Sequence, residues 1–125
     1  MSERSPFRPA LERALHHALS HLGNLEDGPV AATATLETLR SRLAKPLNRA
    51  PIPAERVIDE LVADTEGGIV ASAGGRFFGW VIGGAVPASL GADWLTSAWD
   101  QNAASFACAP AEAVVEEVCG AWLKE

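Results

Sequence analysis

Residues 76–117 read RFFGWVIGGAVPASLGADWLTSAWDQNAASFACAPAEAVVEE, and their order of elements is the most informative pattern in the chain. An aromatic pair and a glycine-rich apolar turn come first, and a tryptophan-bearing helical pattern follows over residues 87–101. Residues 102–109 are a loop of small side chains. Pro110 then favours the start of a last helix, which carries no stop signal and is expected to continue to Glu125.

The glycines of residues 67–86 argue against helix in the middle of the chain. Two Gly-Gly pairs flank IVASA and a third follows RFFGWVI, so we expect irregular backbone with a short strand around Phe78–Ile82. The segment contains neither GxxxxGK[ST] nor a GxGxxG that opens a helix. The glycines therefore favour tight turns over phosphate binding.

Three more helices are predicted towards the N-terminus. The first begins at Pro9 and closes at Gly23-Asn24. Either Thr33 or Thr35 caps a second, which Pro46 stops near Ala44. Pro53 opens a third, over AERVIDELVADT. Their expected apolar stripes are Leu11, Leu15, Ala18, Leu19 and Leu22; Leu36, Leu39 and Leu43; and, as buried residues, Val57, Ile58, Leu61 and Val62. The predicted fold class is mainly α, with about five helices around an irregular Gly-rich middle segment.

Composition excludes some functional classes. A chain that is 48% hydrophobic and 21% charged is typical of a globular protein. A formal charge of -6 without a basic stripe argues against nucleic acid and anionic membranes as partners. The N-terminus lacks the apolar core of a secretory signal, and Arg76 and Pro87 interrupt the longest weakly polar stretch, so a cytoplasmic location is expected. Cys108 and Cys119 are too few for a disulfide framework and are expected to be buried thiols.

The histidines resemble a metal site only in part. His17 and His21 are four residues apart and share a helix face, but no Glu or Cys is spaced to complete a ligand set. We therefore expect these two and His16 to be solvent-exposed beside the apolar stripe, and no metal site.

No other group of side chains has the pattern of a catalytic centre. Glu112 lies in the first turn of its helix, where a negative charge is favourable, and Glu116 and Glu117 belong to the solvated side. Lys45, assigned to the second helix, and Lys124 both lack the apolar setting that a Schiff-base lysine needs. No catalytic residue is predicted within this chain.

The stretch 76–117 resembles the N-terminal part of the pyridoxal-phosphate-dependent group II amino acid decarboxylases, the family of aromatic amino acid and glutamate decarboxylases. LRSRLAKPL and PAERVIDEL are similar to the family's N-terminal helices. The resemblance implies that residues 1–66 are a helical extension that wraps the second subunit of a homodimer. Residues 67–125 would then lead into the fold type I domain that binds pyridoxal phosphate and contains the catalytic residues. The cofactor belongs to the complete enzyme and is not expected to bind this chain alone.

The resemblance also implies substrate-binding positions for an amino acid. The turn after the FFG element lines the side-chain pocket, here Trp80, Val81, Ile82 and Gly83, and a second wall includes Asn102 and Ala104. Aromatic amino acid decarboxylases tend to have an aromatic residue and Pro-Thr where this chain has Ile82-Gly83-Gly84. Structural alternatives remain open, with Trp80 as core and Asn102 as a helix C-cap. A free-standing helical interaction module without catalysis is the alternative function.

Overall fold

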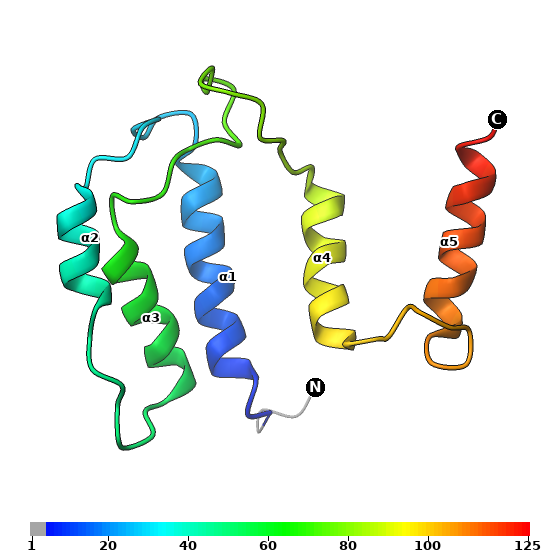
Figure 1. The fold of residues 1–125 in the computed structure, drawn as a ribbon, viewed down its shortest axis with the longest axis horizontal. Helices are drawn as coiled ribbons and strands as arrows, with labels where there is room; N and C mark the ends of the chain where they lie inside the picture. Colours follow the sequence, from blue (N-terminus) through cyan, green and yellow to red (C-terminus); the bar gives the residue numbers. More distant parts are fainter. Residues whose placement is uncertain (1–4) are drawn as a thin grey trace. The chain divides into compact units, whose positions relative to one another are not determined.

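The computed structural model describes residues 5–125, and in this part of the chain the only regular elements are helices (Figure 1). The mainly α prediction is therefore confirmed. The helices are α1 (Arg8–Gly23), α2 (Leu36–Leu43), α3 (Ala54–Thr65), α4 (Pro87–Trp99) and α5 (Pro110–Trp122). None of them is long and apolar enough to cross a membrane.

Local chemistry sets most helix ends. Proline stands in the first turn of α1, α4 and α5, where its missing N–H leaves no helical hydrogen bond unmade. Thr35 caps α2, and its Oγ1 accepts a hydrogen bond of 3.1 Å from the Thr38 amide. Asp100 ends α4 in the left-handed conformation, with φ 48° and ψ 49°.

Four features of the secondary structure differ from the sequence expectation. The strand predicted at residues 78–82 is absent, because no extended segment of the described chain pairs with it. Helix α4 ends at Trp99, since the left-handed Asp100 breaks the helical path before Gln101. Helix α5 ends at Trp122 and does not continue to Glu125. Lys45 lies beyond α2, which stops at Leu43 ahead of Pro46.

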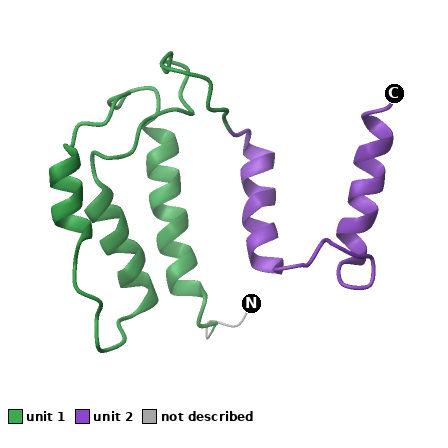
Figure 2. Cartoon of the chain, in the orientation of Figure 1, with its two compact units in different colours: residues 1–84 green, residues 85–125 purple. Residues whose placement is uncertain are grey.

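The chain divides into two compact units, residues 1–84 and residues 85–125 (Figure 2). In the first unit α3 packs against both α1 and α2. The glycine-rich segment is tied to this unit, because the amides of Thr33 and Ala34 donate to the Gly67 carbonyl at 2.8 and 2.9 Å. The Ala71 amide donates to the Val30 carbonyl at 3.0 Å. The family-based division after residue 66 remains a prediction.

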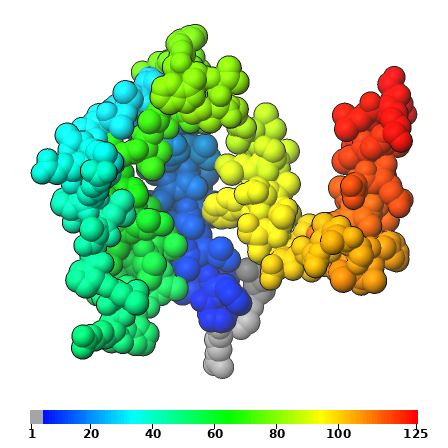
Figure 3. Space-filling view, in the orientation of Figure 1, coloured from blue at the N-terminus to red at the C-terminus, as the bar shows by residue number. Residues whose placement is uncertain are grey.

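The second unit consists of α4, a loop of small residues and α5. The two helices do not pack on one another. Figure 3 shows the atoms of α5 in orange and red. Ala109, which immediately precedes α5, is the one buried residue of this unit. The second unit therefore has no core of its own.

Burial is slight throughout residues 5–125, where Ala71 and Ala109 alone are buried. The predicted apolar stripes exist but are not covered. Contrary to expectation, Val57, Leu61 and Val62 are exposed, and Ile58 is half-buried. Cys108 and Cys119 are exposed free thiols, because no second layer covers the segments that carry them.

Candidate functional site

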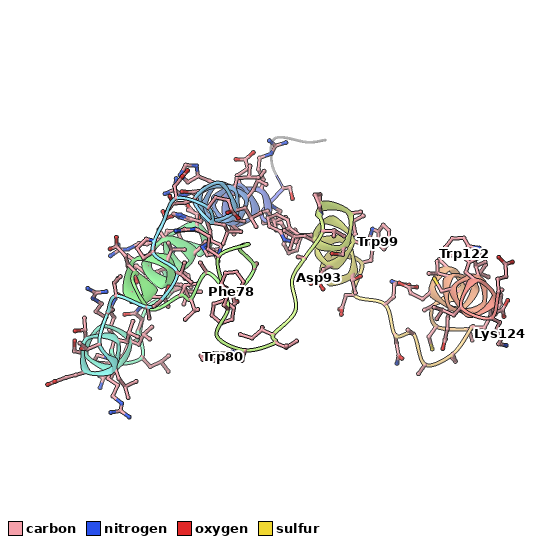
Figure 4. All side chains as sticks on the ribbon, turned by 90° about the horizontal axis from the view of Figure 1, so that it is seen from above. Phe78, Trp80, Asp93, Trp99, Trp122 and Lys124 are labelled. Atoms are coloured by element: carbon pink, nitrogen blue, oxygen red, sulfur yellow. The ribbon has the colours of Figure 1, made fainter. Side chains whose placement is uncertain are left out.

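The predicted pocket residues of the glycine-rich turn lie in an exposed loop of the first unit. Figure 4 shows Phe78 and Trp80 on this loop. The indole of Trp80 packs edge-to-face on Phe77, with ring centroids 5.5 Å apart, yet Trp80 is 67% exposed. The alternative that Trp80 is a core residue is therefore wrong.

The next positions of the loop extend this apolar surface. Val81 and Ile82 are both exposed. Gly83 has a φ of 113°, which side-chain-bearing residues rarely adopt, so glycine is required for the turn that follows. The four predicted positions Trp80–Gly83 thus form a continuous surface that this unit leaves uncovered.

Asn102 and Ala104 lie in the second unit, whereas Trp80, Val81, Ile82 and Gly83 belong to the first. The side-chain oxygen of Asn102 accepts a 3.1 Å hydrogen bond from the Ala104 amide and shapes the loop locally. The C-cap of α4 is Asp100, so the alternative role of Asn102 as a C-cap is wrong.

The most connected polar group of the described chain joins α1 to α3. Arg13 Nε lies 2.8 and 3.0 Å from the two carboxylate oxygens of Asp59, and Arg13 Nη2 lies 2.7 Å from Oδ1. His17 Nε2 lies 2.8 Å from the same Oδ1. An ionised carboxylate only accepts hydrogen bonds, so the imidazole donates through Nε2. We call Arg13, His17 and Asp59 the interhelical cluster.

The contact between Arg13 and Asp59 favours the charged forms of these two side chains. The hydrogen bond from Arg13 and, next, the hydrogen bond from His17 hold the pKa of Asp59 below its ordinary value, although partial burial opposes them. The same bond to Asp59 raises the pKa of Arg13. Asp59 is therefore ionised at neutral pH with its charge compensated, which suits a clamp between two helices.

An open cavity of about 1300 Å³ borders this cluster. His17 and Asp59 contribute to its wall from α1 and α3, and Thr38 and Arg42 contribute from α2. Arg42 Nη1 already donates to the Glu66 carbonyl at 2.9 Å. Of these wall residues, His17, Asp59 and Arg42 make contacts that hold neighbouring helices together.

Sequence reasoning missed the interhelical cluster, and its expectation for His17 was wrong. His16 and His21 are exposed as predicted, but the His17 side chain is only 24% exposed and bonds to Asp59. A signal was present: Arg13 and His17 are one helical turn apart beside the apolar stripe of α1. Their shared partner on α3 could not be identified without the packing of the two helices.

Clusters of ligand side chains and the setting of the lysines bear on whether the chain binds a metal or pyridoxal phosphate. Among residues 5–125 no group of three His, Cys, Asp or Glu side chains is arranged to hold a metal ion. Lys45 forms an ion pair with Asp64 at the surface, and Lys124 is exposed. Neither lysine lies in the buried apolar setting that a Schiff-base lysine needs.

No protein-family model matches the chain, and no curated protein or solved structure matches it either.

Proposed function

We propose that this chain is the N-terminal portion of a pyridoxal-phosphate-dependent amino acid decarboxylase, and that it supplies subunit contacts and substrate-pocket walls. The observation that carries the proposal is the uncovered apolar surface of its helices. On α1, for example, Leu11, Leu15 and Leu19 are about half exposed, with exposed fractions of 53%, 46% and 60%. Soluble monomers rarely leave contiguous surface of this kind uncovered, so a further protein surface is expected to bury it.

The glycine-rich loop supports the pocket role. Trp80, Val81 and Ile82 present apolar side chains outward from a turn that Gly83 makes possible. In the complete enzyme these side chains would contact the side chain of the amino acid and exclude water from it. Asn102 and Ala104 would contribute the second wall when the remainder of the enzyme is present.

The chemistry of the reaction would come from the cofactor, which accepts the electrons of the bond broken when the α-carboxylate leaves as carbon dioxide. Lys45 and Lys124 do not fit the cofactor-binding amine, as described above. The proposal therefore assigns binding and positioning to this chain, and cofactor binding to the other part of the enzyme.

The first test is to read the encoding locus past codon 125, in frame and in neighbouring frames. A continuing segment with a histidine, an aspartate and an isolated lysine is expected; expression of the whole product should then give carbon dioxide release from an amino acid. The 125-residue chain, purified and mixed with pyridoxal phosphate, should show no aldimine absorbance. Such a band in the isolated chain would contradict the proposal.

A second candidate is a free-standing helical interaction module. The interhelical cluster and the Lys45–Asp64 ion pair favour it, since they give the first unit tertiary contacts of its own. Sedimentation separates the two functions. A monomer that binds no apolar dye favours the module, whereas self-association or strong dye binding favours a missing partner surface.

A further inference from the structure

The negative charge of the chain is concentrated in the second unit. Residues 85–125 contain six acidic residues against Lys124 as the one basic residue, which gives -5 of the total formal charge of -6. Three of the acidic residues, Glu112, Glu116 and Glu117, lie on α5, which has no basic residue. Any surface that covers α5 must therefore accommodate negative charge.

Helix α5 also carries an uncovered apolar stripe. Its members are Val114, Val115, Val118 and Trp122, which are 48%, 60%, 40% and 68% exposed. Trp122 is labelled on α5 in Figure 4, away from Trp99 on α4. A helix of 13 residues is marginal in water without tertiary packing, so this stripe needs a partner surface.

Carboxylates flank the stripe on both sides. Glu112 precedes Val115 by three residues, and Glu117 follows Val114 by three residues. Side chains three apart are neighbours on the surface of a helix. A partner that contacts the stripe would thus meet a carboxylate at each edge.

One of these carboxylates borders a small cavity. Trp99, Gln101, Ala111 and Glu112 line a space of about 280 Å³ between the end of α4 and the start of α5. Glu112 Oε2 is closed off from solvent and accepts no hydrogen bond. The nearby amide of Gln101 donates from Nε2 to the Trp99 carbonyl at 2.8 Å and makes no hydrogen bond to this oxygen.

An unpartnered carboxylate oxygen beside an indole is a combination that suits a cation. Leaving such an oxygen desolvated without a donor is unfavourable. Glu112 as a residue is only half-buried, so its carboxylate can turn toward the cavity, where a Lys or Arg side chain would supply the donor. Trp99, which is 60% exposed, lines the same cavity, and its indole can interact with the same cation. The cavity has room for the end of one long basic side chain.

We propose that the second unit binds a basic amphipathic helix of another protein. A Lys or Arg of this partner enters the cavity at Glu112 and Trp99, and its apolar face covers the stripe of α5. A second copy of α5 would bring carboxylates against carboxylates, and an anionic membrane would be repelled in the same way. The proposal concerns α5 and its surroundings, and it holds whether or not the chain belongs to a decarboxylase.

The test is calorimetric titration of the full chain with two synthetic helical peptides of matched length, one of Leu and Lys and one of Leu and Glu. The Leu/Lys peptide is expected to bind and the Leu/Glu peptide is not. Glu112→Gln should weaken binding of the Leu/Lys peptide by roughly tenfold, because it removes the charged acceptor at the cavity. Glu116→Gln, which removes the same charge from the opposite side of α5, should weaken it by less than about twofold.

Trp99→Leu supplies an independent check, with an expected loss of roughly fivefold in affinity for the Leu/Lys peptide. Circular dichroism of each variant confirms that helix content is unchanged. Absence of Leu/Lys binding, equal binding of both peptides, or equal effects of the two Gln variants would overturn the proposal. Sedimentation of the free chain completes the test, because self-association abolished by Val118→Asp would identify a second copy as the occupant.

Discussion

His17 on α1 and Asp59 on α3 are 42 positions apart in the chain, and His17 Nε2 lies 2.8 Å from Asp59 Oδ1. Arg13 binds the same carboxylate from one turn earlier on α1. Two side chains of one helix thus converge on one side chain of another. This convergence helps to define the rotation of α1 against α3.

Asp59→Asn should therefore lower the thermal stability of the first unit at neutral pH. The amide carries no charge and offers one acceptor oxygen where the carboxylate offers two, so the contacts with Arg13 and His17 weaken and the clamp between α1 and α3 loosens. Thermal melting followed by circular dichroism measures the change. Glu60→Gln is the matched control, because Glu60 pairs with Arg56 within α3 and its loss leaves the contact between the helices intact. Equal melting shifts for the two variants would count against the clamp.

The difference in thermal stability between the wild type and Asp59→Asn should depend on pH. Because the pKa of Asp59 is lowered in the folded chain, its stabilising effect is fully present above the ordinary Asp value of about 4. The effect declines as the pH falls from there and vanishes below the lowered folded pKa, where the carboxyl is neutral in both states. Melting of both proteins across this range should show two curves that converge in acid. Curves that stay parallel would show that the stability difference does not come from the ionised Asp59 carboxylate.

The sequence predicts the helices well because their boundaries depend on neighbouring residues. Thr35 and Pro46 act within a few positions of α2, and the prolines of α1, α4 and α5 act within a single turn. The strand expected at residues 78–82 failed for the opposite reason. A strand needs a paired neighbour, and β-branched and aromatic side chains alone do not supply one.

Burial and the polar cluster could not be read from the sequence. An apolar stripe such as that of α3 shows which side of the helix needs cover, but not whether this chain provides the cover. The expectations that Val57 would be core and Cys108 a buried thiol were wrong on this point. The partnership of His17 with Asp59 depends on how α1 and α3 pack, which local patterns do not specify.

The capping of α2 gives a second prediction about stability. Thr35→Ala removes the oxygen that accepts from the Thr38 amide and should destabilise α2 by about 1 kcal/mol. Urea titration followed by circular dichroism measures the loss. Thr35→Ser retains a hydroxyl acceptor and should lose much less, so an equal loss for Ser would show that the methyl group, not the cap, is responsible.

Both thiols should react freely in the native chain. Cys108 and Cys119 are exposed and form no disulfide, so a thiol reagent of modest size should titrate two groups without denaturant. The Cys119→Ser and Cys108→Ser variants should each titrate one. Slow labelling of Cys119 that denaturant accelerates would instead indicate that α5 is covered in solution, by self-association or by a partner that co-purifies.

Gly67 links the glycine-rich segment to the start of α2, and it should not tolerate a side chain. Its φ is 74°, and an added Cβ would lie 2.8 Å from Thr33 Oγ1 and 3.2 Å from Ala34 Cβ. Gly67→Ala therefore combines backbone strain with a steric clash next to the bonds that Thr33 and Ala34 donate to the Gly67 carbonyl. A loss of more than about 1 kcal/mol in the free energy of unfolding is expected. Gly23→Ala, at the end of α1, is the control: an added Cβ there meets nothing within 4 Å, so urea titration should show an unchanged or slightly higher stability.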